Sequence, residues 1–312
     1  MTLQAFLIAG PTASGKSALA VQVAQACGGV VINADSMQVY ADLRVLSARP
    51  DGAELAQAPH ALFGHIDGAV NYSAGLWLAD VAAALAQARA LALMPIITGG
   101  TGLYFKALTL GLSQIPPVPE AVRAAVRLAA QGQSPQALHA QLAACDPVMA
   151  AKLRPSDPQR ILRALEVFAA TGQSLAKFQG TRTAAQLPDA TGLFLQPERT
   201  ALLGNIDARF DAMLANGALA EVRALAARAL DPALPVMRAH GVPHLCAYLR
   251  GETSLDEASL RAKTDTRAYA KRQVTFARHQ LPQLVWTTPE AAYATALQMI
   301  SAARAEKTSG KT

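Results

Sequence analysis

The residues with the clearest chemical potential form one stretch near the start of the chain, Gly10 to Ser17 (GPTASGKS). The spacing G-x-x-x-x-G-K-[ST] lets backbone N–H groups turn inward toward phosphate oxygens, while Lys16 adds a charge and Ser17 a hydroxyl for Mg²⁺. An apolar run precedes the stretch and a helical pattern follows it, which is the context that such a loop needs. The sequence therefore predicts a phosphate site, which would suit a kinase, an ATPase or a transferase that releases diphosphate.

Asp35 follows the second predicted strand, Val30 to Ile32, at the end where open α/β sheets bind their ligands. Its carboxylate could cap a helix, hold Mg²⁺ as in kinases, or accept a proton from a substrate amine as a general base. The position favours the metal and base roles over the cap and leaves those two open.

A third candidate follows another predicted strand, at Thr98 to Tyr104 (TGGTGLY). Two consecutive glycines allow the backbone to approach a ligand closely, and Thr101 offers a hydroxyl beside them. The alternative is an ordinary glycine turn in which Thr101 caps the next helix.

These three segments need a scaffold that brings the ends of several strands together. Apolar runs predict strands at 5–9, 30–32, 95–98 and 193–195, and Ala-rich patterns predict helices at 17–26 and 73–93. Alternating strands and helices indicate a parallel sheet. The expected fold class is therefore α/β, with a P-loop NTPase-like parallel sheet core and an inserted all-helical domain.

Composition along the chain suggests where this insert lies. A connection rich in proline at 115–120 is followed by helical patterns alone, before the apolar run at 193–195. We expect a catalytic core from 1–114 and 191–304, the latter with basic C-terminal helices, a helical insert at 115–190, and a polar, disordered tail at 305–312.

Overall composition excludes several classes of protein. The chain has 312 residues, 52% of them hydrophobic, and a formal net charge of +6, which alone favours an ordinary basic surface over a polyanionic partner. The three cysteines form no CxxC pair, which argues against a structural zinc site or a disulfide framework. No apolar run reaches the roughly 18 residues of a membrane span. We expect a cytoplasmic protein.

The segments GPTASGKS, INADSMQVY and GGTGLY, in this order and spacing, resemble the bacterial tRNA dimethylallyltransferase family. Later segments continue the similarity, namely DPQRILRALEV at 157–167, RFDAM at 209–213, MRAHG at 237–241 and YAKRQ at 269–273. The chain departs from the family pattern at Asn205, where a second arginine is common, and at Val242–His244.

The resemblance implies transfer of a dimethylallyl group from dimethylallyl diphosphate to the exocyclic amine of the adenosine 3′ to the anticodon in tRNA. It also implies that the helical insert at 115–190 contacts tRNA. It assigns two catalytic residues, Asp35 as general base and Thr101 to orient the acceptor, and it implies Mg²⁺ at Ser17. Charge that develops on the leaving diphosphate is what a phosphate loop stabilises, and extrusion of the base exposes its amine. The residues assigned to the diphosphate are Gly10, Pro11, Thr12, Ala13, Ser14, Gly15, Lys16, Ser17 and Arg209.

Basic segments supply candidates for tRNA binding. Between 261 and 278, six Lys and Arg accompany one acid, Asp265, which predicts a cationic helix edge, with a solvated surface as the alternative. On the helix expected after Asp157, Arg160 and Arg163 share a face away from the apolar stripe. The residues expected to contact the anticodon stem-loop are Asp35, Ser36, Met37, Gln38, Thr101, Arg123, Gln159, Arg160, Ile161, Leu162, Arg163, Arg238, Arg267, Lys271, Arg272 and Arg278.

Two other functions stay open on the sequence. A P-loop small-molecule or nucleotide kinase would use the same loop with Asp35 on Mg²⁺, although it would need neither the basic stripe nor the helical insert. A non-catalytic RNA-binding protein with a relict nucleotide fold is the second, and intact Lys16, Ser17 and Asp35 argue against it. We expect the protein to be monomeric.

Overall fold

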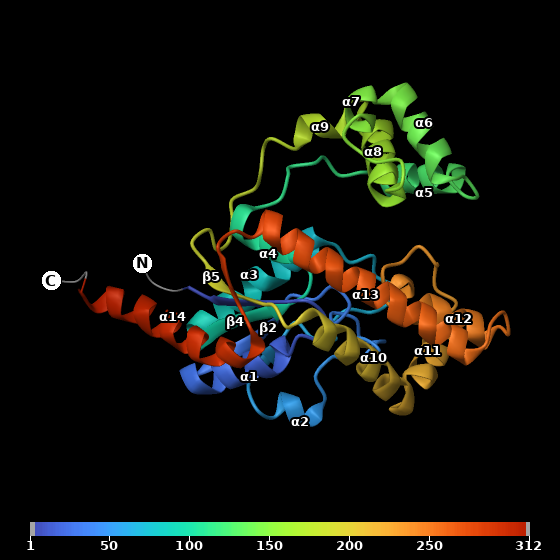
Figure 1. Ribbon diagram of the computed structural model, residues 1–312. Coiled ribbons are helices and arrows are strands. Elements are labelled where there is room, and N and C mark those ends of the chain that lie inside the picture. The colour runs from blue at the N-terminus through green and yellow to red at the C-terminus, as the bar shows by residue number, and fades with distance from the viewer. Residues whose placement is uncertain (1–3, 310–312) are drawn as a thin grey trace. The chain divides into compact units, whose positions relative to one another are not determined.

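The computed structural model describes residues 4–309 and contains a six-stranded sheet in the order β3-β2-β4-β1-β5-β6, with every neighbouring pair parallel (Figure 1). The strands are β1 (Phe6–Ala9), β2 (Gly29–Asn33), β3 (His60–Ala61), β4 (Met94–Gly99), β5 (Thr191–Leu195) and β6 (Leu284–Thr287). The helices that accompany the sheet are α1 (Lys16–Cys27), α2 (Gly52–Leu55), α3 (Ala74–Ala90), α4 (Gly102–Leu110), α10 (Arg199–Ala215), α11 (Ala218–Ala227), η1 (Val236–Arg238), α12 (Val242–Leu249), α13 (Leu255–Gln280) and α14 (Pro289–Ser309). The expected α/β class is confirmed.

Alternate residues of β1 point to opposite faces of the sheet, as the strand period of two requires. Phe6 and Ile8 pack with apolar residues of α1 and α14, whereas Leu7 packs with apolar residues of α3 and α4. Figure 1 shows α1 and α14 on one side of the sheet and α3 and α4 on the other. Both faces are covered, which is why the central strands are continuously apolar.

The neighbouring strands β2, β4 and β1 bring the three candidate segments together. Their register pairs Ala9 with Gly99 and Asn33 with Thr98, so the carboxyl ends of all three strands lie side by side along one edge of the sheet. The chain leaves this edge through the loop after β1, the turn that holds Asp35, and the glycine pair before α4. The fold thus places the chemistry-bearing residues around one point.

Two strands were not predicted, and both lie at the edges of the sheet. Strand β3 has only two residues, too few to give a sequence pattern, and β6 lies in a stretch expected to be mostly helical. In β6, Val285 is 44% exposed while Leu284 is buried, so the strand carries a short half-buried pattern instead of a buried apolar run.

The chain divides into two compact units, one made of 1–109 and 186–312 and the other of 110–185. The second unit has its own apolar core and contains α5 (Glu120–Ala129), α6 (Pro135–Cys145), α7 (Pro147–Ala150), α8 (Pro158–Thr171) and α9 (Leu175–Phe178). This unit begins and ends five residues earlier than the expected 115–190 insert, because the two segments that connect it to the first unit hydrogen bond to each other. The Thr183 N–H donates to the Leu112 carbonyl at 2.8 Å.

The C-terminal end also differs from expectation. Helix α14 continues to Ser309, through most of the range expected to be a disordered tail, and 310–312 lie outside the described residues. Within residues 4–309, no helix has both the length and the apolar character needed to cross a bilayer.

Candidate active site

The loop between β1 and α1 curls as a phosphate loop must. Ala13 and Gly15 have φ values of 63° and 86°, in the left-handed region that a non-glycine residue rarely adopts. Lys16 is buried, and its Nζ donates to the Pro11 carbonyl at 3.2 Å. The Ser14 hydroxyl is buried and has no hydrogen-bond partner within residues 4–309. Such an unsatisfied polar group in a curled loop suits an anionic ligand.

Burial disfavours the charged forms of two cationic side chains at this loop, Lys16 and Arg209. Burial lowers the pKa of Lys16 to about 8, and the positive charge of Arg209 adds to this effect while Asp35 opposes it. Burial likewise lowers the pKa of Arg209, again opposed by Asp35. Arg209 reaches the loop from α10 and donates a hydrogen bond to Thr12 Oγ1. A bound diphosphate would favour the charged form of both side chains, so the loop is prepared for one.

Asp35 is held at the end of β2 by local hydrogen bonds. Its N–H donates to Asn33 Oδ1 at 2.8 Å, and its Oδ1 accepts the Met37 N–H at 2.9 Å. Asn33 is fully buried, and its Nδ2 donates to the carbonyls of Asp35 and Leu62. The other carboxylate oxygen, Oδ2, lies 3.3 Å from the point that a Cβ on Gly100 would occupy. One oxygen is therefore fixed and the other faces the glycine turn.

Thr101 ties this glycine turn to the Asp35 segment. Its Oγ1 accepts the Ser36 N–H at 2.9 Å and lies 3.2 Å from Ser36 Oγ, and its N–H donates to the Ala34 carbonyl at 3.2 Å. A Cβ on Gly99 would lie 2.1 Å from the Ala34 carbonyl oxygen, so only glycine permits this approach. Asp35 and Thr101 thus belong to one rigid arrangement, and Asp35 also acts electrostatically on Lys16 and Arg209.

Helix α13 contributes three residues to the same site. Two of them belong to the segment YAKRQ at 269–273, which resembles the family, but none of the three was expected to line the site. Tyr269, Gln273 and Phe276 have i, i+4, i+7 spacing and share one face. Gln273 hydrogen bonds to the phosphate loop and to the glycine turn, and Phe276 lies where a Cβ on Gly102 would clash at 2.3 Å. Burial and the charge of Asp35 raise the pKa of the Tyr269 hydroxyl, whose hydrogen-bonding neighbours are Thr101 and Gln273.

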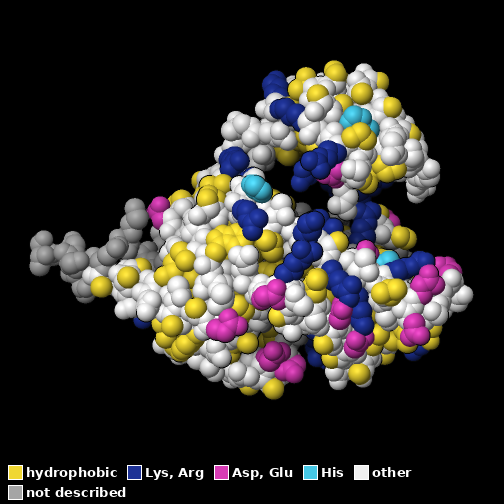
Figure 2. Space-filling view, in the orientation of Figure 1, with side chains coloured by type: hydrophobic (Ala, Val, Ile, Leu, Met, Phe, Trp, Pro, Cys, Tyr) yellow, Lys and Arg dark blue, Asp and Glu magenta, His cyan; other side chains and the backbone are white. Residues whose placement is uncertain are grey.

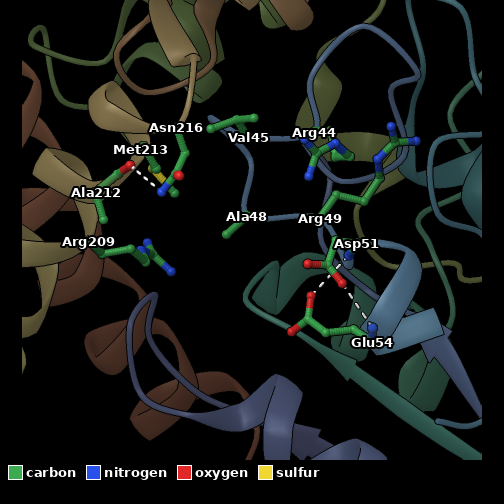
Figure 3. Close-up of a pocket in the computed structure, with 10 residues that line it drawn as sticks. All are labelled: Arg44, Val45, Ala48, Arg49, Asp51, Glu54, Arg209, Ala212, Met213 and Asn216. Carbon is green, nitrogen blue, oxygen red and sulfur yellow. Dashed lines mark hydrogen bonds between the residues drawn. The ribbon is translucent and has the colours of Figure 1, made fainter. Parts of the chain in front are cut away.

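A cavity of about 480 Å³ is lined by Arg209, the residue that hydrogen bonds to Thr12 of the phosphate loop (Figure 3). Figure 3 shows Arg209 reaching into it from α10, and the opposite wall carries Asp51 and Glu54, which hydrogen bond to each other's backbone. The lining residues are Arg44, Val45, Ala48, Arg49, Asp51, Glu54, Arg209, Ala212, Met213 and Asn216. This mixture of cationic and apolar groups suits a ligand that has both anionic and apolar parts.

Around the cavity, the side chains of Glu221 and Gln38 hold backbone segments in place through hydrogen bonds. Glu221 of α11 accepts the N–H groups of residues 44, 45 and 46. Gln38 donates both of its amide hydrogens, to the Ser47 carbonyl at 3.0 Å and to the Ala48 carbonyl at 2.8 Å. The geometry therefore orients the Gln38 amide so that its oxygen is left as an acceptor. Of the other candidates, Met37 packs against the core and Arg238 is exposed in η1.

The basic stripe on α13 is less cationic than expected, because acids from α10 pair with it. Arg267 binds both carboxylate oxygens of Asp207, with Nε 3.0 Å from Oδ1, and Lys263 lies 2.6 Å from Asp211. Arg267 therefore joins α13 to α10 through an ion pair and is not the unpaired cation that the sequence suggested. The stripe residues that stay exposed without an acidic partner among the described residues are Lys271, Arg272 and Arg278. Figure 2 shows Lys and Arg side chains over α13 with acids beside them.

The structure shows the surroundings of the two departures from the family pattern, Asn205 and Val242–His244. Asn205 is exposed on α10. Val242 is buried at the start of α12, with Pro243 in the first turn, and His244 lies 2.8 Å from Asp265, the acid within the stripe. Neither departure adds a group to the site.

In the helical unit, one expected tRNA contact is wrong. Ile161 is fully buried in the core of this unit, so its side chain cannot touch RNA. Asp157 caps α8, the helix expected after it, and it pairs with Arg160. Of the other candidates there, Gln159 and Arg160 are exposed, Leu162 and Arg163 are half-buried, and Arg123 pairs with Glu120 at 2.7 Å. Glu166 is 3% exposed and binds Arg127 at 3.0 Å and Arg163 at 3.5 Å.

Comparisons with known proteins identify the family to which the chain is similar. The profile of the IPP transferase family matches residues 38–280, and that of isopentenyl transferase matches residues 3–62. Curated tRNA dimethylallyltransferases from Methylocella silvestris and Beijerinckia indica are 63% and 62% identical to this chain. Their alignments cover 94% and 92% of this chain and 97% and 96% of the relatives.

Solved structures give the same result. The full-length tRNA isopentenylpyrophosphate transferase from Bacillus halodurans has a TM-score of 0.70 and 27% identity, with 99% of each chain covered. A eukaryotic dimethylallyltransferase seen acting on tRNA has a TM-score of 0.75 and 26% identity over 95% of this chain and 77% of that one. The match extends over nearly the whole of this chain, and we conclude that it belongs to the IPP transferase family, the tRNA dimethylallyltransferases.

Proposed function

We propose that this protein transfers a dimethylallyl group from dimethylallyl diphosphate to the exocyclic amine of the adenosine 3′ to the anticodon in tRNA. The products are N6-dimethylallyladenosine and diphosphate. Family membership supports this reaction, and one structural observation carries it. The Asp35 carboxylate lies at the same strand edge as the phosphate loop and acts electrostatically on both of its cations, Lys16 and Arg209. A kinase has no support among the relatives compared.

The proposed step forms a bond from nitrogen to carbon and breaks a bond from carbon to oxygen. The amine nitrogen attacks C1 of the dimethylallyl group, the bond from C1 to the diphosphate oxygen breaks, and the diphosphate leaves with the electron pair. Asp35 accepts the proton that the amine loses, as a general base. Lys16, Arg209 and the N–H groups of the loop stabilise the charge on the leaving diphosphate.

The acceptor base is held by the Asp35 segment in this proposal. Thr101 and Ser36 hydrogen bond to each other, which keeps both hydroxyls in fixed places beside the base. Gln38 donates both amide hydrogens to backbone carbonyls, so its oxygen would accept a hydrogen bond from a base. The flipped adenosine is a suitable occupant, because extrusion gives the enzyme access to its amine.

Mg²⁺ fits the loop through Ser17. This residue is half-buried directly after Lys16, and its hydroxyl makes no hydrogen bond to another described residue. Mg²⁺ keeps several of its water ligands and is otherwise held by a few protein oxygens together with substrate phosphates, so Ser17 and a diphosphate could supply the ligands that are not water. Within residues 4–309, no cluster of three His, Cys, Asp or Glu side chains offers another metal site. When bound, the ion would supply positive charge to the leaving group.

We propose that the tRNA is bound mainly through its phosphates, by a monomer working in the cytoplasm. Exposed cations support this proposal on each unit considered separately. They are Arg238, Lys271, Arg272 and Arg278 on the first unit and Arg160, beside the exposed Gln159, on the second. The half-buried Arg123 and Arg163, which pair with Glu120 and Glu166, are the further candidates on the second unit.

The proposed function is tested by incubating the protein with unmodified tRNA, Mg²⁺ and either dimethylallyl diphosphate or ATP. The tRNA is then digested to nucleosides and analysed by mass spectrometry. We expect N6-dimethylallyladenosine with dimethylallyl diphosphate. Phosphoryl transfer from ATP to a small molecule, without prenylated adenosine, would overturn the proposal.

A further inference from the structure

Gln273 is a buried polar side chain, only 6% exposed, at the centre of the long helix α13. Its Oε1 accepts the Thr12 N–H at 2.9 Å, and its Nε2 donates to the Gly100 carbonyl at 2.8 Å. These partners lie 261 and 173 residues away in the sequence. One belongs to the phosphate loop and the other to the turn that carries Thr101. A single side chain therefore joins the two loops that we assign to the two substrates.

The chemistry of the side chain matches this bridge. An uncharged carboxamide offers an acceptor and a donor side by side, whereas a carboxylate offers two acceptors and an ammonium only donors. The bridge meets an N–H on one side and a C=O on the other, so each end of the amide has the required polarity. Gly100 is needed as well, because a Cβ there would lie 2.2 Å from Gln273 Nε2.

Neighbouring contacts fix the same two loops. Arg209 donates to the hydroxyl of Thr12 while Gln273 accepts from its N–H, so both polar groups of that residue are held. On the acceptor side, Tyr269 lies one turn before Gln273 on α13 and has Thr101 and Gln273 as hydrogen-bonding neighbours. Burying an amide gains little net stability even when it is hydrogen-bonded. The contacts are better explained by geometry than by stability.

We propose that Gln273 is a positioning residue that sets the spacing between the donor loop and the acceptor loop. This inference rests on the proposed function. The amine of the acceptor must stand in line with the bond from C1 to the diphosphate, and a misplacement of about 1 Å costs about 100-fold in rate. Each substrate keeps the contacts of its own loop when the bridge is lost. The loss therefore falls on kcat and leaves both KM values nearly unchanged.

The test compares Gln273→Glu, which keeps the shape but replaces the donor with a second acceptor, with Gln280→Glu. Gln280 lies on the same helix, where its oxygen accepts from Lys106 Nζ at 2.6 Å, so the same chemical change is made outside the bridge. With tRNA and dimethylallyl diphosphate, Gln273→Glu should lower kcat about 100-fold with both KM values within about threefold of wild type. Gln280→Glu should keep the wild-type kcat.

Gly100→Ala attacks the other end of the bridge by displacing the amide, and it serves as the test if Gln273→Glu does not fold. It should reproduce the loss in kcat. A wild-type kcat in the folded variant, or a raised KM with unchanged kcat, would overturn the positioning role. Absence of prenylated adenosine with the wild-type protein would instead overturn the proposed function, so the two failures are distinct.

Discussion

Replacing Lys16 with methionine should stabilise the ligand-free protein while it abolishes transfer. In the folded protein burial lowers the pKa of Lys16 to about 8, whereas an unperturbed lysine titrates near 10.5. Each pKa unit corresponds to about 1.4 kcal/mol, so keeping this lysine charged in the folded state costs about 3 kcal/mol. Methionine fills a similar volume without a charge. The variant therefore removes the cost together with the group that binds diphosphate.

The sign of the pH dependence follows from the lowered pKa. Between pH 8 and 10.5 the unfolded chain retains a proton that the folded protein has lost, so the stability of the wild type rises with pH in this range. The cost is about 3 kcal/mol at pH 7 and about 1 kcal/mol at pH 9.5. Because methionine does not titrate, the advantage of Lys16→Met should shrink by about 2 kcal/mol from pH 7 to pH 9.5.

Urea unfolding at both pH values measures this difference, with fluorescence reporting on the buried Trp77. Lys152→Met, at an exposed position of the second unit, is the control and should stay within about 0.5 kcal/mol of the wild type. Dimethylallyl diphosphate should stabilise the wild type and leave Lys16→Met unchanged. A variant less stable than the wild type at pH 7, or a gap that is constant with pH, would refute the reasoning.

Other predictions concern single contacts. Asp35→Asn should lower kcat about 10²- to 10⁴-fold and leave the Kd for tRNA unchanged in a filter-binding assay, and an equal loss of both would remove Asp35 as the base. Arg209→Lys should raise the KM for dimethylallyl diphosphate about tenfold, because an ammonium cannot reproduce the guanidinium geometry, and an unchanged KM would exclude Arg209 from the diphosphate site. For tRNA binding, the logarithm of the association constant falls linearly with the logarithm of the salt concentration, and Lys271→Gln should make this slope less steep by about one. Arg267→Gln should leave that slope unchanged and instead lower the melting temperature, since it breaks the pair with Asp207.

The central part of the fold could be predicted because its signals are local. Strands β1, β2, β4 and β5 are buried on both faces and appear in the sequence as short apolar runs ended by glycine, asparagine or proline. The edge strands gave no such signal, since β3 is too short and β6 alternates between buried and exposed residues. The connection to the helical unit was placed too late because the pairing of Leu112 with Thr183 joins segments that are distant in the chain.

The candidate site likewise combines residues that could be predicted from local sequence with residues that could not. The phosphate loop, Asp35 and Thr101 each lie directly after a strand, so their positions follow from the order of the sheet. Gln273 lies in the family-like segment YAKRQ, but its role gave no local signal, because a glutamine on a polar helix is normally solvated and its partners are 173 and 261 residues away. Ile161 was misassigned for the opposite reason. It lies within a matching family segment, but its apolar type at a buried helix position indicates the core of the unit.

The uneven roles of the cations on α13 follow from helix geometry together with the positions of the acids on α10. At about 100° per residue, Tyr269, Gln273 and Phe276 fall within about 60° of one another, facing the glycine turn. Lys263 and Arg267 lie on a second face toward α10, where Asp207 and Asp211 pair with them. Lys271 and Arg278 lie on this second face too, at about 20° to 40° from Arg267, and Arg272 lies apart from it. These three lie farther along the helix, are exposed and have no acidic partner among the described residues. A charge count along the sequence adds the paired and the unpaired cations together and so overstates the charge available to RNA, whereas the salt slope should report the unpaired cations alone.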